Sequence, residues 1–408
     1  AGRHFVAITD PNSALEALAQ KRGFLGTALG QPDVGGRFSA LSPFGLLPAE
    51  AMGLDPEDLL ARARTMAAAC APFVAADRNP GIRLGLALGT LARSGRDKLT
   101  LSTSPALELF TAWIEQLVAE STGKGGLGIV PIAGEPLGAP DRYAEDRIFV
   151  DLTLAGEASD ATTVERRAKL RALEQAGHPV IHLEISDRRD LVQEVFRWEM
   201  ATATAGAVLG LNPFDQPDVE AAKIASRALM AEAADGGGLP RREANLEIDA
   251  TRLFVAPRLA EHASAPEDAA GWLHALIASL EPNDTFVVNA FLPTSPAIRA
   301  LLQSLRQAVG DARRVATTLD FGPRYLHSTG QLQKGGPDRV VGLQLWQSAA
   351  ARPADALAIP ELGGDFDTLA EAQASGDYSV LAERGRRMIG IDVGPDPMAT
   401  LEALAGWL

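Results

Sequence analysis

The stretch KLTLST, residues 98–103, is an apolar run of strand length, and it begins an alternation that decides the fold class. A helical pattern that ends near Glu120 follows it, and further strand-length runs stand at 128–132, 147–152 and 179–185. Longer helical patterns alternate with such runs along most of the chain. This alternation predicts parallel β-sheets covered by helices on both faces, which is the α/β class.

The alternation extends toward both ends of the chain. A strand pattern at 4–9 precedes helical patterns at 56–76 and 82–92. In the carboxy-terminal part, helical patterns alternate in part with further apolar runs, which stand at 252–256, 285–291, 314–319 and 340–345. The carboxy-terminal part is therefore predicted to form a further, smaller α/β unit.

The run ADGGGLPRRE, residues 234–243, is the best candidate for a linker between units. It combines a glycine triplet with a proline and a cluster of charges, a composition typical of interdomain segments. Together with the start of the alternation near residue 98, it predicts three units: residues 1–95, residues 96–233 and the smaller unit at 244–408.

Composition narrows the functional classes. The 408 residues are 46% hydrophobic and 22% charged, as in ordinary globular proteins. The formal net charge of −14 would repel phosphate backbones, so no nucleic-acid partner is expected. Cys70 is the single cysteine, which excludes a disulfide framework. With neither a leader pattern nor a run of ~18 apolar residues, we expect a cytoplasmic protein without a membrane partner.

The segment VGGRFSALSPFGLLP, residues 34–48, is the first candidate for chemistry. Its paired glycines, ending at Gly36, would let the backbone approach a ligand closely. The guanidinium of Arg37 is a permanent cation that can stabilise an oxyanion. The alternative is a turn beside a surface arginine.

Glu120 is a candidate general base. It stands at the end of the helical pattern LFTAWIEQLVAE and directly before STGKGG, so its carboxylate is expected at a glycine-rich turn near a helix end. A carboxylate there could reach a substrate proton. The alternative is an ordinary solvated glutamate, which the helix dipole disfavours at this end.

The segment NPFDQPDVEAAK, residues 212–223, carries two more candidates. Proline restricts the backbone at 213, so we expect a loop at 212–216 and a helix that begins near Pro217. Gln216 in the loop and Lys223 on the helix could bind a sugar hydroxyl and transfer a proton. The alternatives are a helix cap and a surface lysine.

His327 is the best placed of the six histidines for acid–base work near neutral pH. It lies in FGPRYLHSTGQLQKGG, residues 321–336, in an expected loop after a strand. His178 and His182 flank a strand pattern and are expected to be structural. No histidine and carboxylate cluster has metal-ligand spacing, so neither a metal nor another cofactor is expected.

Taken together, these segments resemble phosphoglucose isomerase (glucose-6-phosphate isomerase), a family with tandem Rossmann-like sugar-isomerase domains. The resemblance covers about residues 2–223, with a short further match around His327. It implies that Arg37, in the arginine loop GGRFS with Gly36 at the substrate, stabilises an enediolate. It also implies that Glu120 in ESTGK transfers the proton between C2 and C1, that Gln216 contacts the sugar, and that Lys223 assists ring opening.

The chain departs from the family pattern in its histidine. Family members carry it a few tens of residues after the base, where this sequence has GEPLGAPDRYAED. The later LHSTGQ resembles the segment that carries the histidine in compact bacterial members. We therefore expect His327 to replace it, with the carboxy-terminal unit folding onto the site of its own chain or of a partner. This order resembles the isomerase half of bifunctional transaldolase/phosphoglucose isomerases, which implies a transaldolase domain upstream.

A second departure concerns the phosphate. The family's GIGGS-type turn and SK[ST]xTT segment, which hold the sugar phosphate, are not in this sequence. Residues 1–95 are therefore expected to be the remnant of a first sugar-isomerase domain, residues 96–233 the second, and the whole a fragment of a longer protein. Such a fragment would bind a sugar phosphate weakly by itself.

The resemblance implies reversible isomerisation of glucose 6-phosphate and fructose 6-phosphate through a cis-enediol, in a homodimer. Two alternatives stay open. One is a non-catalytic domain that binds a phosphosugar, and the other is an inactive fragment of the isomerase. A nicotinamide-dependent oxidoreductase is disfavoured, because no GxGxxG turn follows a first strand.

Overall fold

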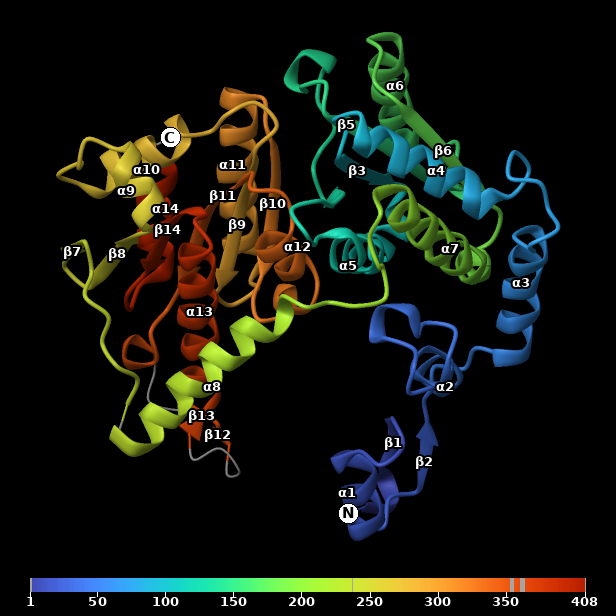
Figure 1. Ribbon diagram of the computed structural model, residues 1–408, viewed down its shortest axis with the longest axis horizontal. Helices are drawn as coiled ribbons and strands as arrows, with labels where there is room; N and C mark the ends of the chain where they lie inside the picture. The colour runs from blue at the N-terminus through green and yellow to red at the C-terminus, as the bar shows by residue number, and fades with distance from the viewer. Residues whose placement is uncertain (1, 237, 353–355, 360–363, 408) are drawn as a thin grey trace.

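The computed structural model describes residues 2–236, 238–352, 356–359 and 364–407. Two principal sheets, each flanked by helices, lie side by side, and a small amino-terminal unit projects away from both (Figure 1). The predicted α/β class with parallel sheets flanked by helices is confirmed.

The amino-terminal unit is built on two parallel strands, β1 (Val6–Thr9) and β2 (Gly26–Leu29), joined by helix α1 (Ala14–Arg22). Three further helices lead away from it: α2 (Pro43–Ala51), α3 (Pro56–Ala69) and α4 (Pro80–Arg93). Each of these three begins with a polar cap followed by proline, and the cap's side chain accepts a hydrogen bond from a backbone N–H of the first turn. That combination satisfies a free N–H group and presets the backbone for a helix.

The first principal sheet has four parallel strands in the order β4-β3-β5-β6. Their bounds are Lys98–Thr103 for β3, Val130–Ile132 for β4, Arg147–Leu154 for β5 and Val180–Ile185 for β6. Its helices are α5 (Phe110–Thr122), α6 (Ala161–Gln175) and α7 (Leu191–Leu209). β3 and β5 are buried almost throughout, as strands covered on both faces must be.

Helix α7 also holds the amino-terminal part of the chain, through an extensive contact with α4. Two glycines of α4 permit the close approach. A Cβ added to Gly85 would collide with Ala201 and Thr204, and one added to Gly89 would collide with Val208. Substituting either glycine is therefore expected to separate the two helices.

The second principal sheet has six strands in the order β10-β9-β11-β14-β8-β7. The first four are parallel, and β8 and β7 continue the sheet antiparallel. The bounds are Leu246–Ile248 for β7, Thr251–Val255 for β8, Thr285–Phe291 for β9, Ala316–Phe321 for β10, Val340–Trp346 for β11 and Arg387–Asp392 for β14. Although the sequence predicted the smaller unit here, this sheet has more strands than the first.

Seven helices accompany the second sheet in the described part of the chain. They are α8 (Val219–Gly236), α9 (Pro257–His262), α10 (Ala269–Ala278), α11 (Pro296–Arg313), α12 (Thr329–Gly335), α13 (Phe366–Glu383) and α14 (Pro397–Gly406). Two short antiparallel strands of two residues each lie near α8 and α13: β12 (Ala358–Ile359) and β13 (Gly364–Asp365).

The connection between the two principal sheets differs from the predicted linker. Helix α8 begins at Val219, near Pro217 as expected, but it continues to Gly236, so the first residues of the 234–243 segment are helical. Residue 237 lies outside the described residues. The division of the chain into units at this segment stays a prediction.

Candidate functional site

Helix α5 carries two glutamates that are candidates for chemistry or charge effects. Both are buried: Glu115 is 6% exposed and Glu120 is 8% exposed. The helix is capped by Gly123, where an added Cβ would collide with Leu332 of α12. Glu120 itself is buried beside Arg37 and Gln116, and it is not the solvated helix-end glutamate of the alternative reading.

The turn after α5 is shaped by its glycines. Gly125 and Gly126 have φ of 60° and 76°, a region that residues with a side chain avoid. The hydroxyl of Thr122 ties the turn down: it donates to the Val118 carbonyl (2.8 Å) and accepts from the Ile129 N–H (3.0 Å). The segment STGKGG thus turns back toward β4 of the first principal sheet.

Arg37 lies beside Glu120 in a group of polar side chains from distant segments. It belongs to a short 3-10 helix, η2 (Gly36–Phe38), and is only 3% exposed. Its Nη1 lies 3.3 Å from Oε1 of Glu120 and donates to Oε1 of Gln216 at 3.0 Å. The alternative prediction, a turn beside a surface arginine, is therefore wrong.

The remaining donors of Arg37 are also used. Nε donates to the Ser121 hydroxyl (2.8 Å), and Nη2 donates to the carbonyls of Pro213 (2.7 Å) and Asp215 (3.1 Å). Burial lowers the pKa of Arg37, while Glu120 and Asp215 oppose that shift. One guanidinium thus joins the 36–38, 110–122 and 212–216 segments, which we call the Arg37 cluster.

Lys124 is a member of this region that the sequence analysis did not single out, although it stands in the ESTGK motif. Its Nζ donates to Oδ1 of Asp215 (2.7 Å) and to the carbonyl of Asn212 (2.8 Å). Burial lowers its pKa, and the bond to Asp215 acts in the opposite direction. Lys124 and Arg37 therefore both hold the 212–216 loop, and both donate to the carbonyl of Asp215.

Gln116 completes the surroundings of Glu120. Its Nε2 donates to Oε2 of Glu120 at 3.2 Å, one helical turn away. Each carboxylate oxygen of Glu120 thus has one polar neighbour, Arg37 or Gln116. Gln116 precedes Glu120 by four positions, and residues so spaced share one face of a helix. This spacing could have identified Gln116 from the sequence.

The other candidates lie outside these contacts. Lys223 is on α8, its side chain is 42% exposed, and it pairs with Glu220 at 3.4 Å. His327 is the exposed last residue of a short 3-10 helix, η7 (Arg324–His327), instead of lying in an open loop. Gly36 is exposed, and an added Cβ there would meet nothing. Within the described residues, no hydrogen bond or ion pair joins Lys223 or His327 to Glu120.

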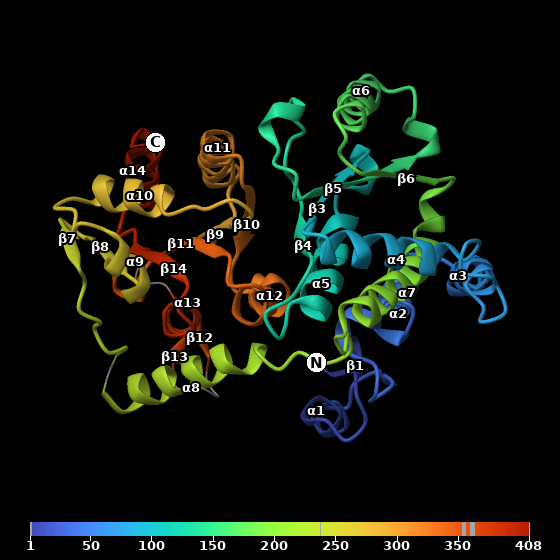
Figure 2. The same ribbon diagram turned by 45° about the horizontal axis from the view of Figure 1, so that its top comes forward.

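The LHSTGQ segment nevertheless packs beside the cluster, within the same chain. Helix α12 lies next to α5 in both views (Figures 1 and 2). Gln331, a residue of α12, is fully buried. Its Nε2 donates to the Gly123 carbonyl (2.9 Å) and to Oδ2 of Asp218 (2.7 Å), and its Oε1 accepts from the Asp218 N–H (2.9 Å). This glutamine connects the turn after α5, the start of α8 and the segment that carries His327.

The next residues of the motif anchor α12 to the second sheet. The amide groups of Gln333 and Asn289 exchange hydrogen bonds of 2.7 and 3.1 Å. Lys334 forms a fully buried ion pair with Asp377, which also accepts a hydrogen bond of 2.5 Å from the Tyr325 hydroxyl. Much of LHSTGQLQK therefore serves to dock η7 and α12.

We expect Gln331→Leu to weaken this docking. The change removes three hydrogen bonds and leaves buried polar groups unpaired, at a cost of about 2 to 5 kcal/mol in the free energy of unfolding. Urea denaturation followed by circular dichroism would measure it. Gln303→Leu is the matched control, because Gln303 makes a single exposed bond to Gly134; equal losses in the two variants would contradict the assignment.

Glu115 lies in a second buried charge group, toward the second sheet. Its Oε1 accepts from Nη2 of Arg324, three residues before His327, at 3.3 Å. The pKa of Glu115 is raised to about 8, first by burial and then by Asp320, while Arg324 and Arg306 oppose the shift. Asp320 is itself fully buried, and its pKa is also raised, chiefly by burial.

These shifts predict a pH dependence of stability. The pKa of Glu115 is raised from 4.5 to about 8 in the folded state, so its contribution is fully present below about pH 4.5 and is lost as pH rises toward 8. We expect the free energy of unfolding to fall less over this range in Glu115→Gln than in the unmodified chain. Urea midpoints at several pH values would show it.

The control for this prediction is Glu165→Gln, since Glu165 lies on the surface and pairs with Lys169. It should follow the unmodified chain. Glu199, whose pKa burial also raises to about 8, contributes to the slope in every variant and cancels in the comparison. An identical pH slope in Glu115→Gln and the unmodified chain would show that Glu115 is ionised in the folded protein.

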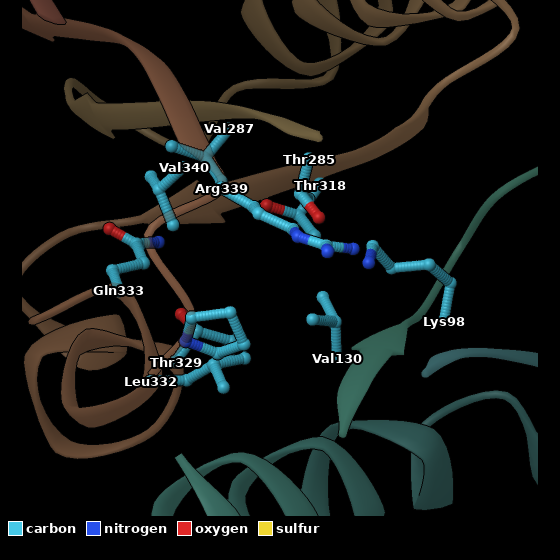
Figure 3. Close-up of a pocket in the computed structure, with 11 residues that line it drawn as sticks. Lys98, Val130, Thr285, Val287, Thr318, Thr329, Leu332, Gln333, Arg339 and Val340 are labelled. Carbon is cyan, nitrogen blue, oxygen red and sulfur yellow. The ribbon is translucent and has the colours of Figure 1, made fainter. Parts of the chain in front are cut away.

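A small cavity also lies between the sheets, apart from the Arg37 cluster (Figure 3). Its volume of about 20 Å³ is enough for one water molecule. Lys98 and Arg339 extend into the gap from opposite sides in Figure 3. Lys98 is already paired with Asp97 at 2.5 Å. We therefore regard this cavity as part of the packing between the sheets.

Metal-ligand clusters and membrane-spanning helices are both absent from the described residues. Among these residues, no group of three or more histidine, cysteine, aspartate or glutamate side chains could hold a metal ion. In the same part of the chain, none of the helices has both the length and the apolar character needed to cross a membrane.

Comparison with known proteins adds an independent observation. No protein-family model matches the chain. It is 34% identical to the glucose-6-phosphate isomerase of Rubrobacter xylanophilus over 264 residues, which cover 55% of this chain and 60% of that protein. It is 30% identical to the glucose-6-phosphate isomerase of Bacillus cytotoxicus over 266 residues, which cover 56% of this chain and 58% of that protein. Over about half of its length, the chain is similar to glucose-6-phosphate isomerases.

Two solved structures are also similar. A hypothetical protein from Thermus thermophilus has a TM-score of 0.49 and 26% identity, covering 56% of this chain and 63% of that one. A glucose-6-phosphate isomerase from Chlamydia trachomatis has a TM-score of 0.46 and 18% identity, covering 57% of this chain and 54% of that one. The chain spans 58–60% of the length of the Rubrobacter xylanophilus and Bacillus cytotoxicus proteins.

Proposed function

We propose that the chain carries the proton-transfer part of a glucose-6-phosphate isomerase, which interconverts glucose 6-phosphate and fructose 6-phosphate through a cis-enediol. The Arg37 cluster is the observation that carries this proposal. It brings Arg37, Glu120 and Gln216 together from segments far apart in the sequence. The relationship to glucose-6-phosphate isomerases supports the substrate class.

In this proposal Glu120 moves the proton between C2 and C1 of the open-chain sugar. Its carboxylate lies 3.3 Å from Arg37, whose charge would stabilise the negative oxygen that forms on the enediolate. A preorganised donor of this kind can contribute ~2.7 to 4 kcal/mol to lowering the barrier. Gln216, oriented by Arg37, would bind a sugar hydroxyl, and the open space at Gly36 would let the sugar lie against the backbone.

Ring opening is assigned to His327 and Lys223. The packing of α12 on α5 supports the assignment of His327, because it brings the LHSTGQ segment beside the helix that bears Glu120. Lys223 would have to leave Glu220 to reach a sugar oxygen. Its exposure on α8 gives the side chain that freedom. A homodimer, a cytoplasmic location and an upstream transaldolase domain remain predictions of the sequence resemblance.

Hydrogen exchange at the sugar tests the proposal directly. The natural protein that contains these 408 residues is incubated with fructose 6-phosphate in D₂O, and NMR follows deuterium at C2 of the glucose 6-phosphate formed. We expect incorporation at C2, because proton transfer through Glu120 allows exchange with solvent. Sugar-phosphate binding without isomerisation or exchange would instead support the non-catalytic alternative, which the exposed and separately paired Lys223 favours.

A further inference from the structure

A second cavity, of about 480 Å³, lies in the carboxy-terminal unit at the end of its parallel strands. Trp346, the last residue of β11, lines it, and so does Arg252, which pairs in register with Asp392 at the end of β14. Ligands of open α/β sheets bind outside the carboxyl ends of the strands. A volume of about 300 to 1,000 Å³ is typical of small-molecule sites. Both properties point to a ligand site.

The lining of this cavity is rich in arginine, in a chain whose net charge is −14. Three arginines line the cavity: Arg241, Arg242 and Arg252. The acidic side chain among the lining residues is Glu371. Arg252 is paired with Asp392 (3.1 Å), and Arg241 is paired with Glu247 (2.8 Å). Their charges are largely balanced within the protein.

Arg242 differs from the other two arginines. Its guanidinium lies over the ring of Tyr378, 5.2 Å from the centroid, and donates to the hydroxyl of Ser379. Among the side chains that the structure describes, no carboxylate lies within 4.0 Å of it. Burial lowers its pKa, and Tyr378 and the carboxylate of Glu383 oppose that shift only in part. An anion in the cavity would supply the missing partner.

Other groups of the lining suit the rest of such a ligand. Ser348 and Ser375 line the cavity, and their hydroxyl groups make no hydrogen bond to described protein atoms. Glu371 is held at the wall, where its Oε2 accepts from the Ala349 N–H at 2.7 Å. The cavity therefore offers one guanidinium that has no carboxylate partner among the described residues, and the hydroxyl groups of Ser348 and Ser375.

We propose that this cavity binds a small phosphate monoester, with Arg242 as its main anion contact and Ser348 and Ser375 as hydroxyl partners. A guanidinium matches phosphate oxygens through two parallel N–H donors. The cavity is lined by the 238–254, 346–350 and 368–375 segments, and it shares no residue with the Arg37 cluster. It is thus a second ligand site, whose existence does not depend on the proposed isomerase activity.

Calorimetric titration of the 408-residue chain with glycerol 3-phosphate tests the proposal, at mildly alkaline pH. We expect Arg242→Gln to weaken binding about tenfold or more, because it removes a charge-assisted contact. Glu371→Gln should tighten binding, since it removes a negative charge and keeps an acceptor for Ala349. Arg227→Gln is the matched control, because Arg227 is an exposed arginine outside the cavity.

Arg37→Lys tests whether the cavity is distinct from the Arg37 cluster. Glycerol 3-phosphate should still bind to the cavity in that variant. Equal affinities in Arg242→Gln and the unmodified chain would overturn the proposal. So would a failure of glycerol 3-phosphate to bind, or tighter binding of acetate than of the phosphate ester. Because Arg242→Gln and Glu371→Gln are expected to act in opposite directions, a general loss of folding cannot imitate the result.

Discussion

Glu120→Gln is expected to lower kcat for glucose 6-phosphate isomerisation by about 10²- to 10⁴-fold, the usual contribution of a general base. The amide cannot accept the C2 proton. It keeps a carbonyl oxygen for the Arg37 guanidinium, which lies 3.3 Å from the carboxylate in the unmodified chain. The fold and the sugar-phosphate affinity should therefore change little. A coupled assay of isomerisation, with calorimetric binding of a non-reacting sugar phosphate, would measure both.

The matched control for this prediction is Glu165→Gln, a change of the same chemistry on the surface of α6. It should leave kcat and affinity unchanged. Full turnover in Glu120→Gln would remove Glu120 from the mechanism. Loss of binding together with turnover would instead assign it to holding Arg37 and the 212–216 loop, a structural role.

Much of the secondary structure could be predicted from apolar periodicity alone. The strand pattern at 98–103 coincides with β3, and the run at 285–291 coincides with β9. Neither β14 nor α13 is predicted by these patterns. β14 begins with Arg387 and contains Gly390, so its apolar run is short, and the buried Arg387 pairs with Asp284 at 2.8 Å. Such a partner, about a hundred residues away, leaves no local signal.

The candidate site was predicted residue by residue, but its contacts were not. The sequence identified Arg37, Glu120 and Gln216, and these three meet in the structure. It left open whether Arg37 is a surface arginine and Glu120 a solvated glutamate. Both are buried because the 36–38 and 110–122 segments and the 212–216 loop, far apart in the sequence, meet around the Arg37 guanidinium. Long-range docking of this kind has no periodicity, so sequence patterns cannot reveal it.

Arg37→Lys is expected to have the second large effect, on both stability and catalysis. A guanidinium has five N–H donors in a rigid plane, whereas an ammonium is a point charge with three. Lysine cannot serve Ser121, Gln216 and the 213–215 carbonyls together, although it keeps the positive charge. Leaving such buried acceptors unpaired should cost about 2 to 5 kcal/mol in the free energy of unfolding, which urea denaturation would measure.

The catalytic effect of Arg37→Lys should be a loss of about 10²- to 10³-fold in kcat, the usual result of losing one oxyanion donor. It is measured at a temperature where the variant is fully folded, so that the loss of stability does not contribute. Arg227→Lys is the control, since Arg227 is 71% exposed and pairs with Glu220 alone. If stability fell while kcat stayed normal, Arg37 would only assemble the cluster. If both fell, one guanidinium would serve as both the structural centre and the oxyanion partner.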